Sequence, residues 1–144
     1  MTGRMIVIGL VGFAALFGLG LWYAQFYAFY EETTAQEVEI NGVAYSVADW
    51  TGIDASSSPL KLRACFQLAE TPEAPLAPEP TPLVAPPWFD CFDAGAIDAA
   101  LRAGEAVAYL AAREEALGVN RIVVRYPDGR AFMWRQLNER YANQ

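Results

Sequence analysis

The most pronounced hydrophobic pattern in the chain is an uncharged run at its N-terminus. From Met5 to Tyr30 there are 26 residues without a charge, and Gln25 is the only strongly polar side chain among them. A helix needs about 20 apolar residues to cross the ~30 Å hydrocarbon core of a bilayer, and a buried helix of such length is rarely apolar on every face. The run therefore predicts a transmembrane anchor over residues 1–30.

Aromatic side chains gather at the C-terminal end of this run. Tryptophan and tyrosine rings concentrate where lipid meets water, so this end is expected at a membrane interface. The membrane lipid bilayer is thus the first expected partner of the chain. The predicted interface residues are Trp22, Tyr23, Phe26, Tyr27 and Tyr30.

The charges that flank the run indicate its orientation. Arg4 precedes it, whereas Glu31 and Glu32 follow it, and positive charge is retained on the cytoplasmic side. The N-terminus is therefore expected in the cytoplasm and the rest of the chain outside it. A cleaved signal peptide is the alternative, but its apolar core usually has about 7–15 residues, and cleavage after Ala28 would place Phe26 where a small residue is needed.

Two small residues in the run have the spacing of a helix-packing motif. Ala14 and Gly18 form a small-xxx-small pair, which lets a second helix approach closely. The pair predicts a helix-packing position and a membrane-protein partner. The alternative is that the pair has no packing role, since glycine is common in membrane helices in general.

Alternating apolar positions predict strands in the domain that follows. Residues 31–35 are expected to form a polar connector and residues 36–144 the domain. Gln36–Ile40 and Val43–Val47 flank Asn41-Gly42, a pair that favours the type I′ turn of a β-hairpin because both residues adopt positive φ.

The next strand is expected only after a loop over residues 48–59. Leu60–Leu68 alternates leucine, alanine and phenylalanine with Lys61, Arg63, Cys65 and Gln67, which predicts a third strand. Further along, Arg121–Tyr126 and Arg130–Leu137 flank Pro127-Asp128-Gly129 and predict a second hairpin.

One helix is predicted between these strands. Asp93 precedes the alanine-rich Ala94–Ala103 and Gly104 follows it, as is typical of the two ends of a helix. Glu105–Ala112 fits a helix by composition and a strand by alternation, and we expect a strand. The predicted fold class is α+β: a transmembrane helix followed by a small antiparallel β-sheet domain with one short helix.

Prolines concentrate in one segment of the domain. Residues 70–87 hold seven of the nine prolines, which excludes a helix or a central strand. The segment is expected to be an extended surface loop that is mainly solvated. Recognition by a groove-type domain is the alternative interpretation.

The two cysteines lie before and after the proline-rich loop. Outside the cytoplasm, Cys65 and Cys91 most simply form one disulfide that closes this loop. Free thiols are an alternative. Redox or nucleophilic chemistry is a third, but it usually needs a CxxC pair or a cation that lowers the thiol pKa, and the nearby Arg63 alone is weak support.

Composition excludes several classes of function. Nine basic residues against 17 acidic ones follow residue 30, a net charge of −8, which disfavours nucleic acid as a partner. The chain has no histidine, and two cysteines cannot build a Cys-only zinc or iron–sulfur site. No glycine-rich phosphate loop is present. No cofactor, no metal and no nucleotide is therefore expected.

Carboxylates and aromatics are the remaining candidates for a site. Paired carboxylates would suit an envelope hydrolase, but none of the acidic residues forms a recognisable motif. Arg121 and Arg125 share one face of a predicted strand and are expected to meet acidic residues across the sheet. Trp88 and Phe89 follow Pro86-Pro87 on a loop and are candidate partner contacts, with core packing as the alternative. The carboxylates considered are Asp90, Asp93, Asp98, Glu114, Glu115 and Asp128.

Several segments together resemble an uncharacterised family of small single-span proteins from alphaproteobacteria, known as a domain of unknown function. The resemblance implies a bacterial inner membrane and a periplasmic domain, and it brings no activity, cofactor or catalytic residue. The segments that carry it are the run ending in Tyr-Ala-Gln-Phe-Tyr-Ala-Phe-Tyr, Ser58-Pro59 with Arg63-Ala64-Cys65-Phe66, Trp88-Phe89-Asp90-Cys91-Phe92-Asp93, and Tyr126-Pro127-Asp128-Gly129-Arg130 with Trp134-Arg135-Gln136.

The sequence thus favours a non-enzymatic, membrane-anchored periplasmic domain. We expect a protein-interaction role, such as an accessory or assembly subunit of an inner-membrane complex. An envelope hydrolase or ligand-binding domain that uses carboxylates is the alternative. It requires a concave pocket in which two acids with raised pKa converge.

Overall fold

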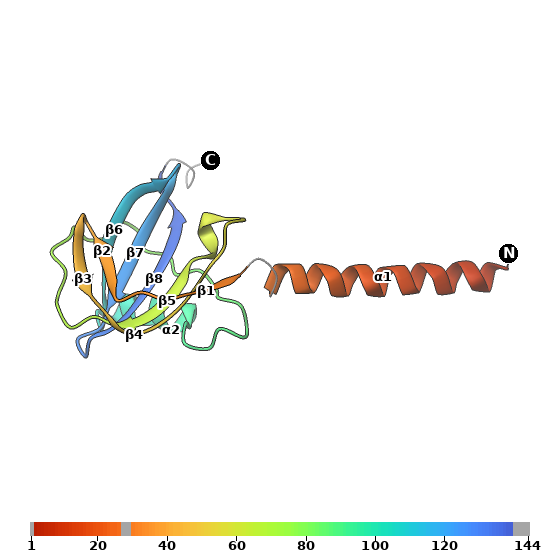
Figure 1. The fold of residues 1–144 in the computed structure, drawn as a ribbon, viewed down its shortest axis with the longest axis horizontal. Coiled ribbons are helices and arrows are strands. Elements are labelled where there is room, and N and C mark those ends of the chain that lie inside the picture. The colour runs from red at the N-terminus through yellow and green to blue at the C-terminus, as the bar shows by residue number, and fades with distance from the viewer. Residues whose placement is uncertain (1, 27–29, 140–144) are drawn as a thin grey trace.

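The computed structural model describes residues 2–26 and 30–139 (Figure 1). It has an N-terminal apolar helix followed by an antiparallel β-domain with one further α-helix, which confirms the predicted fold class. The elements are α1 (Gly3–Phe26), β1 (Glu31–Thr33), β2 (Glu37–Ile40), β3 (Val43–Ser46), β4 (Ala48–Asp54), the 3₁₀ turn η1 (Pro59–Lys61), β5 (Arg63–Gln67), α2 (Ala94–Ala103), β6 (Val107–Ala116), β7 (Val119–Arg125) and β8 (Arg130–Leu137).

Helix α1 is an exposed apolar rod. Large side chains such as Phe13 and Leu16 are 69% and 74% exposed. At 1.5 Å per residue, its 24 residues span about 36 Å, more than the ~30 Å hydrocarbon core of a bilayer. The helix is therefore long and apolar enough to cross a membrane. Within the predicted anchor, α1 covers Gly3–Phe26, and residues 27–29 lie outside the described residues.

The β-domain is built on one curved antiparallel sheet. Its strand order is β1-β4-β5-β8-β7-β6, and β2 and β3 form a separate hairpin. The outer edge of β6 receives further chain segments: Asn41 N–H donates to the Ala111 carbonyl, and Leu110 N–H donates to the Pro75 carbonyl. These bonds cover an edge that would otherwise offer free backbone groups to other chains.

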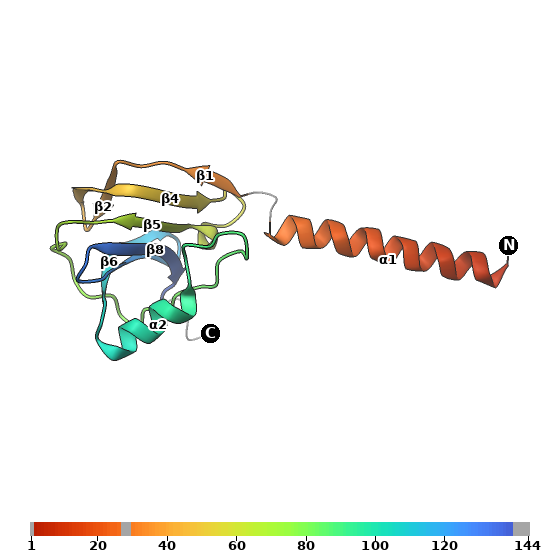
Figure 2. The same ribbon diagram turned by 90° about the horizontal axis from the view of Figure 1, so that it is seen from below.

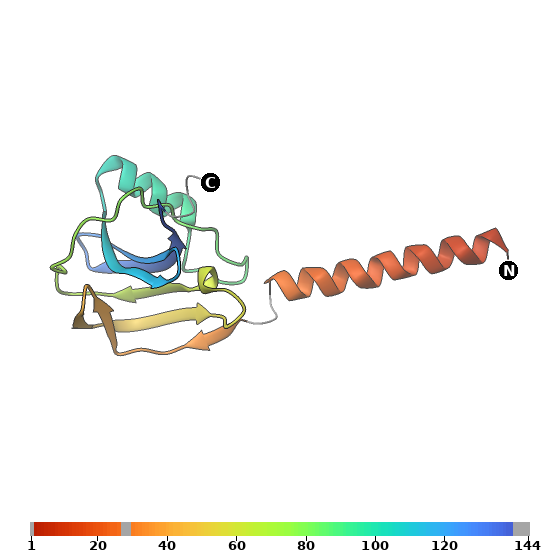
Figure 3. The same cartoon turned by 90° about the horizontal axis from the view of Figure 1, so that it is seen from above.

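Each face of the sheet has its own hydrophobic core. On one face the β2–β3 hairpin packs Val38, Ile40 and Tyr45 against β5, β7 and β8. On the other face α2 packs Ile97 and Ala100 near β6, β7 and β8, on the side of the sheet far from β1 (Figures 2 and 3). The domain is thus three-layered: a hairpin, a sheet, and a layer of helix and loops.

Strand β5 lies in the middle of the sheet and is buried on both faces. Ala64 and Phe66 enter the core beneath the hairpin, whereas Cys65 enters the core on the side of α2. The predicted polar face is therefore not solvated, and Arg63 is only 6% exposed. The strand is also shorter than predicted, because Ser58 caps a 3₁₀ turn at Pro59–Lys61 before it.

Two strands were not expected from the sequence. The predicted connector 31–35 contains β1, and the predicted loop 48–59 contains β4. Strand β4 is irregular because Asp49 has a positive φ of 54° and the register with β5 shifts between Ala48 and Thr51. Such a bulge disrupts the alternation that identifies a strand.

The other predicted elements are present. Both hairpins form, and the predicted strand Glu105–Ala112 is a strand from Val107 onward, as part of β6, rather than a helix. Asp93 accepts a hydrogen bond from Ala96 N–H at the start of α2. Gly104 closes the helix at φ 77°, a left-handed conformation that glycine adopts without strain.

Gly52→Ala is expected to destabilise the attachment of β1. A Cβ atom at Gly52 would lie 2.5 Å from Thr33 Oγ1 and 2.6 Å from Trp50 Nε1, and these two atoms form a hydrogen bond of 3.2 Å. We expect a loss of about 1–3 kcal/mol in urea denaturation of the full chain, with faster amide exchange in β1. Gly95→Ala is the control, since its Cβ meets nothing closer than 3.5 Å, and equal losses in both variants would contradict the prediction.

Candidate functional site

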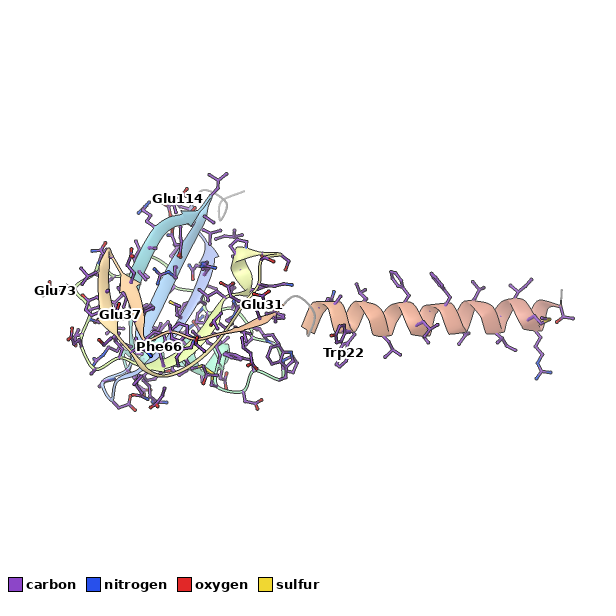
Figure 4. The ribbon with its side chains drawn as sticks, viewed as in Figure 1. Trp22, Glu31, Glu37, Phe66, Glu73 and Glu114 are labelled. Atoms are coloured by element: carbon purple, nitrogen blue, oxygen red, sulfur yellow. A yellow bond between two sulfur atoms is a disulfide. The ribbon has the colours of Figure 1, made fainter. Side chains whose placement is uncertain are left out.

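A cleft opens where the chain passes from α1 into the β-domain. It has a volume of about 530 Å³ and lies between strands β1 and β4 and the loop over residues 88–91. Ile53 and Phe89 supply apolar wall, and Glu32 and Asp90 are exposed carboxylates at its rim. Figure 4 shows Glu31, the first residue of β1, on the side of the domain that faces α1.

A disulfide fixes the loop side of this cleft. Cys65 and Cys91 are joined, with their Cα atoms 6.3 Å apart, as predicted. Next to this bond, Phe89 N–H donates to the Pro86 carbonyl in a tight turn. Phe92 is buried beside Trp134. The loop is thus covalently attached to β5 and anchored in the core, so the cleft has a fixed wall.

The two aromatic residues predicted to contact a partner differ in position. Phe89 is 6% exposed and belongs to the core. Its ring fills the space beneath the loop, so its main role is packing. Trp88 is half-buried, with its ring centroid 5.6 Å from that of Tyr30 and 6.3 Å from that of Phe89. Trp88 therefore connects the cleft wall to the N-terminal end of the domain.

The predicted membrane-interface residues are distributed over helix and domain. Trp22 and Tyr23 lie near the end of α1 with 49% and 58% of their surface exposed. Tyr30 lies beyond the helix and packs on the domain, with Lys61 Nζ 5.1 Å above its ring. Phe26 is the last residue of α1, and Tyr27 lies outside the described residues.

The predicted helix-packing pair lies on α1. Ala14 and Gly18 are one turn apart, and nothing lies within 4 Å of a Cβ placed at Gly18. The close approach of a second helix at this point stays a prediction.

The proline-rich segment is pinned to the domain at its start by Arg125 of β7. Its guanidinium donates to the carbonyls of Leu68 and Ala69 at 2.8 and 2.9 Å and to Thr71 Oγ1 at 3.3 Å. Prolines lack the N–H that a strand ladder requires, so the carbonyls of such a segment need other donors. Arg125 supplies two such donors just before the segment and one bond to a side chain within it. Among the described residues it forms no ion pair with a carboxylate across the sheet, contrary to the prediction.

Gln136 of β8 holds the middle of the segment. Its Nε2 donates to the Glu79 carbonyl at 3.0 Å, and its Oε1 accepts from Thr81 N–H at 2.7 Å and from Trp134 Nε1 at 2.9 Å. The segment is irregular and lies at the surface, as predicted. Most of its residues are exposed, in line with the predicted solvated loop, and strand side chains in addition fix its backbone at several points.

Arg63 of β5 holds the end of the segment and is the residue that sequence reasoning missed. Nε donates to the Leu83 carbonyl at 3.1 Å and Nη2 to the Val84 carbonyl at 3.2 Å. Nη1 donates to the carbonyls of Leu60 and Leu62, both at 2.6 Å. One guanidinium thus joins η1, β5 and the loop beside the cleft.

The charge of Arg63 is balanced without a carboxylate. The ion pairs among residues 2–26 and 30–139 do not include it, and its guanidinium lies 5.8 Å from the Phe92 ring centroid. Burial lowers the pKa of this guanidinium, although arginine stays protonated in proteins. The sequence showed Arg63 as one of four positions on a predicted polar strand face and gave no sign that it is buried.

The β-domain matches a known protein family. Residues 32–144 match the model of a family of unknown function, DUF6446. The chain belongs to this family. No curated protein and no solved structure matches it. The DUF6446 match contains both cysteines, the cleft residues and the three side chains that pin the proline-rich segment, whereas α1 lies outside it.

Two arginines of the DUF6446 domain face each other across β7 and β8. Arg121 and Arg135 are direct partners in the register, which is unfavourable for like charges. Glu115 lies between them, 2.8 Å from Arg121 Nε and 3.3 Å from Arg135 Nε. Asp54 is a further partner of Arg135 at 3.4 Å. The expected acidic partner of Arg121 is thus present, and it is Glu115.

This cluster shifts the ionisation of Glu115. Burial alone would raise the pKa of the Glu115 carboxyl, but Arg121 and Arg135 outweigh burial and hold the pKa below its ordinary value. A depressed pKa in the folded state adds stability at neutral pH, and this contribution is lost as the pH falls through the folded pKa. Glu115 therefore serves the fold at neutral pH.

Glu115→Gln is expected to lower stability by about 1 kcal/mol at pH 7, because both arginines lose their shared counter-charge while Glu115 stays partly solvated. At an acidic pH below the depressed pKa of the folded state, where the wild-type carboxyl is protonated, the difference should shrink. Urea denaturation of the full chain at both pH values measures this. Asp98→Asn, which removes the exposed pair with Arg102, is the control. A loss at Glu115 that does not depend on pH would contradict the electrostatic account.

The described part of the DUF6446 domain contains no group of three metal-ligating side chains close enough to hold an ion. The other carboxyl with a shifted pKa is Asp128, where hydrogen bonds from Arg130 lower the pKa. Its role is local, since Asp128 stabilises the turn between β7 and β8. The cleft beside β1 is therefore the best candidate site in the described residues.

Proposed function

We propose that the chain is a non-enzymatic domain tethered to the bacterial inner membrane and held in the periplasm, where it binds another membrane protein. The cleft between β1, β4 and the loop over residues 88–91 would receive an extended segment of that protein. The observation that carries this proposal is the character of the cleft, which combines an apolar wall with an acidic rim at the end of the domain nearest α1.

The compartment is supported by two independent features. The helix α1 is long and apolar enough to cross a membrane, and the disulfide between Cys65 and Cys91 suits an oxidising environment such as the periplasm. The flanking charges add the orientation, because Arg4 lies before the helix and Glu31 and Glu32 lie after it.

The chemistry of the cleft specifies its partner. Glu32 and Asp90 favour a lysine or arginine, and Trp88 and Ile53 favour a neighbouring apolar or aromatic side chain. The partner is therefore an extended, basic segment close to the membrane surface. Its length is limited to a few residues by the size of the cleft.

A carboxylate hydrolase is the less favoured alternative. It requires acids that converge in a pocket with raised pKa values. The pKa values of the Glu115 and Asp128 carboxyls are instead shifted downward, and each carboxyl is bound to arginine. These shifts suit structural roles and give the alternative no support.

Charge reversal at the rim tests the proposal. The double variant Glu32→Lys/Asp90→Lys should lose a partner that the wild-type chain retains during purification from native membranes in mild detergent. Glu37→Lys/Glu39→Lys is the matched control, because it makes the same charge change on the exposed side of β2, far from α1 (Figure 4). This control should retain the partner.

Two outcomes would overturn the proposed function. A wild-type chain that purifies as a clean monomer at its natural expression level has no stable partner. If both double variants lose the partner equally, the net charge of the domain, and not the cleft, governs binding.

Orientation has a separate test, since Lys61 is the only lysine in the sequence. A membrane-impermeant amine reagent applied to spheroplasts should label Lys61 without permeabilisation. Labelling only after the membrane is opened would place the domain in the cytoplasm and contradict the proposed compartment.

A further inference from the structure

We propose that the DUF6446 domain rests on the lipid headgroup layer through one defined face, formed by Tyr30, Lys61, Val84 and Trp88. This headgroup face rests on the proposed function in one respect, because it requires α1 to lie in a bilayer. It goes beyond that function in assigning the lipid itself as a partner of the folded domain.

The first argument is the length of the tether. Helix α1 ends at Phe26 and β1 begins at Glu31, so five Cα–Cα steps separate them and span at most about 18 Å. A domain of this size is roughly 30 Å wide. The tether is therefore shorter than the domain is wide, and it keeps the side that holds Tyr30 within about 18 Å of the end of α1 and thus near the headgroups.

The second argument is the set of side chains around Tyr30. Trp88 packs edge-on against the Tyr30 ring with centroids 5.6 Å apart, and Lys61 Nζ lies 5.1 Å from the centroid of the same ring. Tyrosine, tryptophan and lysine are the residues that anchor membrane proteins at the lipid–water boundary, since each combines an apolar body with a polar end.

Val84 supplies an exposed aliphatic side chain on the loop that leads to Trp88. It is 83% exposed, and Arg63 holds its backbone in place through the bond from Nη2 to the Val84 carbonyl. The loop through residues 82–88 reaches toward the side of α1 (Figures 1 and 2). A largely exposed valine on a loop that is held in place near a membrane anchor is well placed to enter the headgroup region.

Charge decides the kind of lipid contact. Glu31 and Glu32 are exposed beside this face, and Lys61 is the cation there that lies at the surface. The face is therefore not a basic patch, and its contact does not depend on anionic lipid. We expect it to form on zwitterionic phosphatidylcholine.

Nuclear magnetic resonance of the full chain in phosphatidylcholine nanodiscs tests the headgroup face. With a spin label on the lipid headgroup, the amide signals of Lys61 and Val84 should broaden to loss. The signal of Val43 should persist, because Val43 is an equally apolar, 50% exposed residue on β3, at the far end of the domain (Figure 1). Val84→Asp should restore the Lys61 signal, and Val43→Asp should leave the pattern unchanged.

The Tyr23 signal near the end of α1 separates the possible failures. If the Tyr23 signal broadens while the Val84 and Val43 signals change to the same extent, the proposed headgroup face is wrong, but α1 still lies in the bilayer. If Tyr23, Lys61 and Val84 all keep their signals, α1 does not lie in the bilayer and both proposals fall. If Val84→Asp leaves the Lys61 signal broadened, Val84 is not part of the contact and the proposed face is wrong.

Discussion

Arg63→Leu is expected to destabilise the β-domain by about 3–4 kcal/mol, since four carbonyl oxygens each lose a hydrogen bond worth roughly 1 kcal/mol. The buried side chain makes four hydrogen bonds. Two go to carbonyls in η1 and just before β5, and two go to the carbonyls of Leu83 and Val84 in the loop. Urea denaturation of the full chain in detergent measures the loss. Amide exchange should accelerate in the loop over residues 82–88.

Arg63→Lys separates the shape of the guanidinium from its charge. The ammonium group of lysine keeps the positive charge, but it cannot donate to all four carbonyls, which the planar guanidinium reaches with three separate nitrogens. We therefore expect Arg63→Lys to lose more than half as much stability as the leucine variant. Arg102→Leu, which removes an exposed arginine of α2, should change stability by less than about 0.5 kcal/mol. Wild-type stability in the lysine variant would show that the fork does not matter.

Removal of the disulfide is the second large effect. Cys65→Ala/Cys91→Ala should lower stability by about 3 kcal/mol, because the cross-link closes a loop of 26 residues and restricts the unfolded chain. The bond also fixes the loop that carries Trp88. Tryptophan fluorescence should therefore report a more exposed Trp88 before the domain unfolds.

Reduction of the wild-type chain is the control for this variant. It breaks the cross-link while keeping both sulfur atoms in place, so it distinguishes the loss of the bond from the loss of buried side-chain volume at Cys65. Reduced wild type and the double variant should lose similar amounts of stability. A reduced chain as stable as the oxidised one would contradict a stabilising role for the disulfide.

Local sequence patterns predicted the two hairpins and the helix of this fold, but they did not predict the strands β1 and β4 at one edge of the sheet. The Asn41-Gly42 turn and the Asp93 cap act within a few residues, so they leave a signal in the sequence. Strand β4 lacks such a signal because its bulge at Asp49 breaks the alternation. Gly52 resembles a turn residue, but its role is to let Thr33 and Trp50 approach the strand.

The candidate site was predicted in part for a similar reason. The pairing of Cys65 with Cys91 followed from the compartment, and Trp88 from its position after two prolines. The contacts of Arg63, Arg125 and Gln136 with the proline-rich segment join residues 20–57 positions apart. Because nearly all of these contacts are between a side chain and a backbone group, they do not depend on the identity of the residue that supplies the backbone group, and the sequence gives no sign of them.

The pinned proline-rich segment has a consequence for the lifetime of the protein. A long irregular stretch at the surface is normally where a protease cuts first, because an active site must draw in several residues in extended form. Here each part of the stretch is bonded to a strand behind it. Cleavage therefore requires the sheet itself to open, and the segment should survive digestion for as long as the domain stays folded.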